Sequence, residues 1–229
     1  MRYALYFTPP EDDPLTKTAA RWLGRDVFSG EDLTFEPVSG FTRDQVVALT
    51  SEPCRYGFHA TLKAPFELAD GQSEDALVEA LGRFSANARV FDIPSVAVGQ
   101  LGPFFALVPE EPHRPLQDFA ASVVEAFEPF RAPLSDADIA RRKPEKLNDA
   151  QRANLMRWGY PYVMEEFRFH MTLTGPVEPD ASAAVATLLH ERFAAFFGRP
   201  LRISGLALCV EKNRGAPFTI HSWLPLGGA

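Results

Sequence analysis

Two short stretches of this sequence decide its fold: FHATLKAP (58–65) and FHMTLTGP (169–176). They are identical at five of eight positions, including a histidine and a threonine two residues apart. In a β-strand, residues two apart point to the same face. Each stretch therefore predicts a strand with an apolar face and a polar face that carries a His-Thr pair. A regular strand would also turn Tyr56 and Phe58 away from His59, into the core.

Each stretch opens a unit with the same order of predicted elements: strand, helix, strand, strand. The first unit covers residues 58–109, with its helix after the capping residue Ser73, and the second covers 169–225, with its helix after Ser182. Strands are expected over 90–98, 104–108, 201–210 and 218–224. Because two copies are too few for a repeat array, we expect residues 1–229 to form a single domain with an internal duplication.

Residues 110–168 connect the two units and contain the conspicuously basic stretch RRKPEK (141–146). An apolar helix is expected over 116–130. The basic stretch has two interpretations. It is either a solvated helix whose charge is offset by neighbouring acidic residues, or a flap over a cleft that brings cations to a phosphate.

The polar faces of the two strands supply the candidate site. His59, Thr61 and Lys63 share one face, and Arg168, His170, Thr172 and Thr174 share the other. If the units pack about a pseudo-twofold axis, these faces meet across a cleft. Two imidazoles can then act as a base and an acid at neutral pH, which makes the two histidines the catalytic candidates. The hydroxyls, Lys63 and Arg168 would bind the phosphate of a substrate.

Composition narrows the class of ligand. The formal charge of −7 opposes binding of long nucleic acids, so a small phosphorylated substrate is the better expectation. Two cysteines, Cys54 and Cys209, give no disulfide framework and no zinc motif, and no metal or other cofactor is expected. No apolar run is long enough for a membrane span and no signal peptide is recognised, so we expect a soluble, cytoplasmic protein. The oligomeric state is left open.

FHATL and FHMTL resemble the paired HxTx motifs of the two-histidine (2H) phosphoesterase superfamily. RYGFHATLKAPF, WGYPYV and EFRFHMTLTGP also make nearly the whole chain similar to an uncharacterised group of that superfamily associated with phosphonate-utilisation genes. The resemblance implies an α+β, bilobal fold with two pseudo-symmetric antiparallel sheets and flanking helices around a central cleft. It also implies catalysis by His59 and His170, with Thr61 and Thr172 binding phosphate.

The resulting prediction is a phosphoric diester hydrolase. It would be a metal-independent phosphoesterase that cleaves a small cyclic or 2′-linked phosphodiester, such as a cyclic ribose phosphate or nucleotide of phosphonate metabolism, by His/His acid-base catalysis. One alternative is an RNA 2′,3′-cyclic phosphodiesterase or end-processing enzyme. An alternative of another class is a non-catalytic protein that binds a phosphorylated ligand in the same cleft. The near-symmetric strands do not indicate which histidine is the acid and which is the base.

Overall fold

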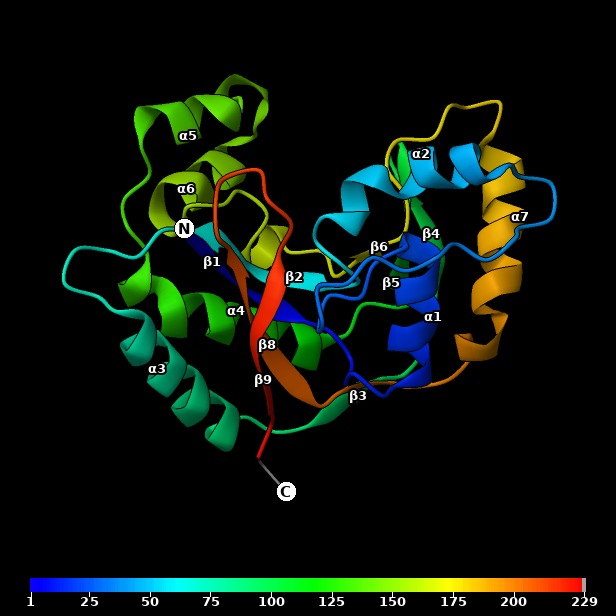
Figure 1. The fold of residues 1–229 in the computed structure, drawn as a ribbon. Coiled ribbons are helices and arrows are strands. Elements are labelled where there is room, and N and C mark those ends of the chain that lie inside the picture. The colour runs from blue at the N-terminus through cyan, green and yellow to red at the C-terminus, as the bar shows by residue number, and fades with distance from the viewer. Residues whose placement is uncertain (228–229) are drawn as a thin grey trace.

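Three antiparallel sheets and seven α-helices make up residues 1–227, the part of the chain that the computed structural model describes (Figure 1). The predicted α+β class with antiparallel sheets is confirmed. The number of sheets differs from the expected two, because a separate two-stranded sheet joins the two units.

The largest sheet has four strands in the order β2-β1-β8-β9. It carries the first histidine stretch on β2 (Ala60–Phe66), beside β1 (Arg2–Phe7). The hairpin of β8 (Gly205–Glu211) and β9 (Thr219–Pro225) completes it on the other side of β1.

The second histidine stretch joins a three-stranded sheet in the order β4-β5-β6. Here β6 (Met171–Thr172) pairs with β5 (Phe104–Pro109), which forms a hairpin with β4 (Val96–Leu101). The remaining pair is β3 (Phe91–Ile93) with β7 (Leu201–Ile203). The strand expected over 90–98 is therefore two strands, broken at Pro94, because proline cannot donate a ladder hydrogen bond.

The two sequence units are interleaved rather than stacked side by side. The histidine strand of the first unit, β2, lies in the same sheet as the hairpin of the second unit, β8-β9. The histidine strand of the second unit, β6, pairs with the hairpin of the first, β4-β5, and β3 pairs with β7 between them. This exchange brings the two histidine strands together, although their histidines are separated by more than 100 residues in the sequence.

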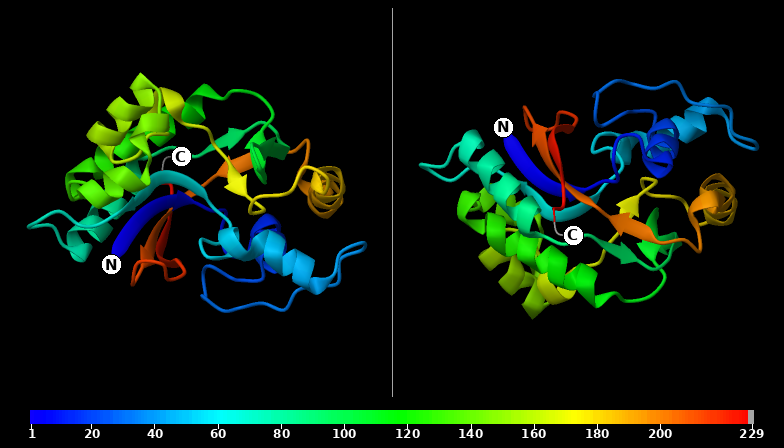
Figure 2. Two further views of the ribbon diagram at one scale, coloured as in Figure 1. Left: turned by 90° about the horizontal axis from the view of Figure 1, so that it is seen from above. Right: turned by 90° about the horizontal axis from the view of Figure 1, so that it is seen from below.

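The helices flank the sheets on two sides of the molecule. Their bounds are α1 (Pro14–Leu23), α2 (Arg43–Cys54), α3 (Glu74–Asn87), α4 (Arg114–Phe127), α5 (Asp136–Arg141), α6 (Asp149–Trp158) and α7 (Ser182–Phe193). Figure 2 shows α3 and α4 on one side and α7 on the other. Ser73 caps α3 as expected, whereas Ser182 is the first residue of α7 and its hydroxyl donates to Gln100 instead. Within residues 1–227, no helix has the length and apolar character that crossing a membrane would need.

A continuous apolar core joins the two sides. Trp22 of α1 is 1% exposed, and its Nε1 donates a 2.7 Å hydrogen bond to the carbonyl oxygen of Leu173, just after β6. Phe7 of β1 packs on Phe169, with ring centroids 6.0 Å apart. These contacts tie the segment that carries His170 to α1 and to the four-stranded sheet, so the two histidine strands hold a fixed relative position.

Candidate two-histidine site

One pocket of about 230 Å³ contains both histidines and both threonines of the repeated stretches, His59, Thr61, His170 and Thr172. Its remaining lining residues are Arg2, Tyr6, Tyr56, Ala64, Pro65, Arg142 and Tyr160. An adjoining hollow of about 340 Å³ shares Thr61, Tyr160 and His170 with it. The convergence predicted from the sequence is therefore present: four side chains from two distant strands line one cavity.

Both imidazoles are anchored in the same way. Nδ1 of His59 lies 2.9 Å from the carbonyl oxygen of Gly57, and Nδ1 of His170 lies 2.7 Å from that of Arg168, in each case two residues earlier. A carbonyl oxygen only accepts, so each Nδ1 carries the proton and donates it. In the neutral imidazole Nε2 then holds the lone pair, which can accept a proton or a hydrogen bond.

His59 is the more enclosed of the two histidines. Its ring stacks on Tyr6 with centroids 4.0 Å apart, and the ring of Tyr56 lies 5.9 Å away. The pKa of His59 is lowered from about 6.5 to about 4, chiefly by burial; the hydrogen bond to Gly57 opposes this shift and the nearby His170 adds to it. Its Nε2 is 3.2 Å from the Thr61 hydroxyl. At neutral pH His59 is therefore an uncharged base.

His170 has a more open setting. Like His59 it is half-buried, but its aromatic neighbour Phe104 lies farther away, at a centroid distance of 5.9 Å with the planes inclined by 52°. It borders both the 230 Å³ pocket and the 340 Å³ hollow. The two motifs are alike in sequence, but they place one imidazole under a tyrosine and the other at an open edge.

Tyr56 lines the pocket, which corrects its predicted place in the core. The regular strand begins only at Ala60, and Gly57 has a φ of +71°, which turns the chain between Tyr56 and His59. A side chain at position 57 would place its Cβ 2.5 Å from the Cβ of Val27. Glycine is required there, so the strand alternation cannot be extended back to Tyr56.

Lys63 does not reach the pocket, which corrects its predicted contact with phosphate. The residue is 2% exposed, and its Nζ donates to Glu128 at 2.7 Å and to the carbonyl oxygen of Val124 at 3.1 Å. Burial lowers the pKa of its ammonium group, while the Glu128 carboxylate opposes that shift. The cause of the displacement is a register shift: Tyr6 pairs with Thr61 but Leu5 pairs with Lys63, so one extra residue reverses the alternation after Thr61.

The matching residue in the second stretch, Thr174, is turned away as well. It is 1% exposed, and its hydroxyl accepts a 3.0 Å hydrogen bond from the backbone N–H of Phe105. The backbone N–H groups of both Leu173 and Thr174 donate to the carbonyl oxygen of Phe105, which marks the end of regular pairing. The HxT core of each motif faces the cavity, and the residue two positions later does not.

Arg168 lies beside the site rather than inside the histidine pocket. Its exposed side chain borders the adjoining 340 Å³ hollow together with Tyr162 and Glu166. Glu166 accepts a 2.8 Å hydrogen bond from Gln151 of α6. The predicted contact between Arg168 and a ligand is therefore possible only for a ligand that extends into this hollow, and its carbonyl oxygen has a separate role as the anchor of His170.

Two arginines of the pocket, Arg2 and Arg142, were not among the predicted site residues. Arg2 forms a 2.5 Å ion pair with the fully buried Glu211. Burial alone would raise the pKa of that carboxyl, but hydrogen bonds from Arg2, Gly215 and Arg55 outweigh it and keep the pKa below its usual value. The alternation of β1 was a usable signal, because it places Arg2 on the same face as Tyr6. Arg142 comes from the basic stretch 141–146.

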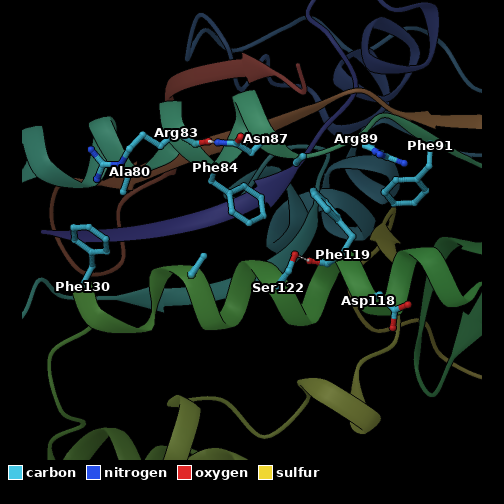
Figure 3. Close-up of a pocket in the computed structure, with 12 residues that line it drawn as sticks. Ala80, Arg83, Phe84, Asn87, Arg89, Phe91, Asp118, Phe119, Ser122 and Phe130 are labelled. Carbon is cyan, nitrogen blue, oxygen red and sulfur yellow. Dashed lines mark hydrogen bonds between the residues drawn. The ribbon is translucent and has the colours of Figure 1, made fainter. Parts of the chain in front are cut away.

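Another hollow lies elsewhere on the surface. It has a volume of about 700 Å³ and runs between α3 and α4, where Phe84, Phe119 and Phe130 line it (Figure 3). None of its lining residues belongs to the histidine pocket. Across residues 1–227, no group of three or more His, Cys, Asp or Glu side chains is arranged to hold a metal ion.

Comparison with known proteins gives a family and two relatives. Residues 61–219 match the family model described as "Protein of unknown function (DUF1045)". "Ribose 1,5-bisphosphate phosphokinase PhnN" of Janthinobacterium sp. (strain Marseille) is 38% identical over 231 residues, which cover 99% of this chain and 51% of that protein. The protein with the same description from Laribacter hongkongensis (strain HLHK9) is 34% identical over 238 residues, covering 100% and 53%. The chain spans about half the length of both relatives.

These descriptions contradict the predicted reaction. A phosphokinase transfers a phosphoryl group, whereas the sequence led us to expect a phosphoric diester hydrolase. The prediction of a metal-independent cyclic phosphodiesterase is wrong by this comparison, and so are the alternatives of an RNA end-processing enzyme and a non-catalytic binding protein. The sequence also contains no Gly-Lys pair, which the P-loop phosphate-binding motif requires.

Proposed function

This chain belongs to the family described as "Protein of unknown function (DUF1045)", and we propose that its two-histidine pocket binds a small phosphorylated ribose for phosphoryl-transfer chemistry linked to phosphonate use. The class of sugar comes from the description of the relatives, which names ribose 1,5-bisphosphate. The link to phosphonates rests on the sequence resemblance to the group found with phosphonate-utilisation genes.

A single observation carries the proposal: two histidines, two threonines and two arginines line one pocket of about 230 Å³. Hydroxyl groups and guanidinium groups are the donors that phosphate oxygens accept best in proteins. Thr61 and Thr172 are proposed to bind the phosphate group between the imidazoles. Arg168, at the edge of the adjoining hollow, is proposed to contact a more distant part of the ligand.

The two histidines are proposed to transfer protons at oxygen atoms of the bound ligand. His59 suits the role of base, because its enclosed ring is uncharged at neutral pH and its Nε2 lone pair points to Thr61. His170 suits proton exchange on the open side, because it borders both hollows, whereas His59 lines only the 230 Å³ pocket. The difference between their environments distinguishes the roles that we propose for the two histidines.

We propose that this chain binds the phosphorylated ribose, and we assign it no P-loop site for a nucleotide. The kinase description belongs to whole relatives, of which this chain spans about half. Without a Gly-Lys pair, its 229 residues hold no P-loop for the phosphates of a nucleotide. The same cavity, in contrast, has the donors that a sugar phosphate requires.

The doubled HxT pattern supports one finer proposal, that this family is a branch of the 2H superfamily in fold and in the layout of its site. The support is the shared anchoring of His59 and His170 and the interleaving of the two strand units. We propose a shared fold and site layout but not a shared reaction, because the descriptions of the relatives contradict hydrolysis.

Isothermal titration calorimetry with ribose 1,5-bisphosphate, ribose 5-phosphate and unphosphorylated ribose tests the binding. We expect the two phosphorylated sugars to bind and ribose to give no heat. Thr61→Val and Thr172→Val should each weaken binding about 10-fold, which corresponds to the loss of one hydrogen bond to a charged group. Absence of binding by both phosphorylated sugars at about 1 mM, a free energy near −4 kcal/mol, would overturn the proposal.

Phosphorus NMR of ribose 1,5-bisphosphate incubated with the chain, with and without ATP and Mg²⁺, tests the catalytic part. With ATP and Mg²⁺ we expect the γ-phosphoryl group of ATP to pass to an oxygen of the ribose phosphate, with ADP released and the displaced proton taken up by a histidine. This rate should fall by at least about 100-fold in His59→Asn and in His170→Asn, and no conversion is expected without ATP. Binding without any conversion by the wild-type chain would contradict proton transfer by the histidines and would leave the ligand assignment intact.

A further inference from the structure

In the part of the chain that the structure describes, Arg142 has no acidic partner, unlike the other arginines of the histidine pocket and of the small basic hollow beside it. Within residues 1–227 it forms no ion pair, although its neighbours in an adjoining small basic hollow do. Those neighbours are Arg2 with Glu211, Arg131 with Glu128, and Arg141 and Arg214 with Asp138. Among the arginines that line the histidine pocket and this basic hollow, Arg142 is therefore the one whose charge is not balanced by an acidic side chain of the described residues.

The position of Arg142 is set by Tyr160. Its guanidinium carbon lies 4.8 Å from the centroid of the Tyr160 ring, in cation-π contact. Tyr160 lines both the 230 Å³ pocket and the 340 Å³ hollow, and Arg142 lines the first of these together with His59 and His170. An exposed arginine stacked on an aromatic ring keeps its N–H donors free for a ligand, because stacking uses its face and not its edge.

The backbone also holds this arginine at the pocket. Arg142 ends α5, with its N–H bonded to the carbonyl oxygen of Ile139 at 3.0 Å. The next residue, Lys143, has a φ of +49°, and among residues 1–227 the other non-glycine residue with positive φ is Met164, just before Glu166 and Arg168. Such conformations are strained and cluster at ligand sites. Both lie in segments that contribute residues to the two hollows.

We propose that Arg142, stacked on Tyr160, binds a second phosphate of the ligand, so that the site selects a ribose bisphosphate over a ribose monophosphate. This inference rests on the proposed function. The histidines and threonines hold one phosphate, and Arg142 holds the other at the far end of the same cavity. Arg2 also lines this pocket but is already paired with Glu211. Of the two arginines that line the pocket, Arg142 is therefore the proposed donor for the second phosphate.

Calorimetric titration of ribose 1,5-bisphosphate, ribose 1-phosphate and ribose 5-phosphate into wild type, Arg142→Gln and Arg142→Lys tests this assignment. We expect Arg142→Gln to raise the Kd of the bisphosphate about 10- to 100-fold, the range for hydrogen bonds to a charged group. The monophosphate that binds wild type more tightly should keep its Kd within about 2-fold. The Kd of Arg142→Lys for the bisphosphate should lie between those of wild type and Arg142→Gln, because lysine keeps the positive charge but lacks the paired N–H donors of the guanidinium group.

Arg141→Gln is the matched control, because Arg141 precedes Arg142 on the same turn but is paired with Asp138 and does not line the histidine pocket. It should leave all three affinities unchanged. Equal weakening of all three ligands by Arg142→Gln would place Arg142 on the same phosphate as the histidines and overturn the inference, as would no weakening at all. A wild-type chain that binds none of the ligands would instead overturn the proposed function.

Discussion

The imidazole of His59 stacks on the phenol ring of Tyr6, with ring centroids 4.0 Å apart and planes inclined by 29°. The other motif histidine, His170, has no such cover. Two nearly identical strands thus provide two chemically different imidazoles. The difference lies in the neighbouring strands: β1 places Tyr6 4.0 Å from His59, whereas β5, beside β6, places Phe104 5.9 Å from His170.

We predict that His59 makes the stability of the protein depend on pH between 6.5 and about 4. Its pKa is lowered to about 4 in the folded state, so the unfolded chain binds more protons in this window and stability falls as the pH falls. The slope from one group is at most about 1.4 kcal/mol per pH unit. Urea denaturation across this range should show a flatter profile for His59→Asn than for wild type. Parallel profiles would contradict a neutral, enclosed His59.

We predict that Lys63→Met lowers stability and leaves ligand binding intact. Lys63 is 2% exposed and pairs with Glu128, which keeps Arg131 as a second partner at 2.6 Å. Loss of the buried ammonium should cost about 1 to 3 kcal/mol in urea denaturation. The Kd for a ribose phosphate should change by less than about 2-fold. Weaker binding without a loss of stability would restore the role in phosphate binding that the sequence first suggested.

We predict that Gly57→Ala disturbs both stability and the site. The substitution meets a φ of +71° and a contact of 2.5 Å with Val27, and the carbonyl oxygen of residue 57 anchors His59. We expect a loss of about 1 to 3 kcal/mol together with weaker binding of a ribose phosphate. Gly71→Ala is the control, since its φ is +80° but nothing lies within 4 Å of the added Cβ. Equal effects of the two substitutions on binding would contradict the anchoring role.

The alternation of residues along a strand accounts for the part of the site that was predictable. His59, Thr61, His170 and Thr172 lie two residues apart in each strand, and their repetition indicated that the two strands face one cavity, where the structure places them. The α+β class, which the resemblance to the 2H phosphoesterase superfamily implied, is confirmed. The catalytic and binding roles of these residues remain predictions.

The features of the fold and of the site that were not predicted depend on contacts between segments that are distant in the sequence. Lys63 and Thr174 leave the polar face because the pairing with β1 and with Phe105 shifts after each HxT, and a single strand does not reveal what its partner does. Arg142 reaches the pocket through a turn whose left-handed residue is a lysine and not a glycine. The exchange of hairpins between the two units likewise has no local signal in either unit.

Both motif histidines should respond to one ligand, and their imidazole Cε1–H signals in NMR measure this directly. On titration with ribose 1,5-bisphosphate, we predict that the signals of His59 and His170 shift together with a single Kd. The signals of His113, His190 and His221, none of which lines the pocket, should stay in place. Signals from His59 and His170 that do not move, or that move with different Kd values, would contradict a shared site.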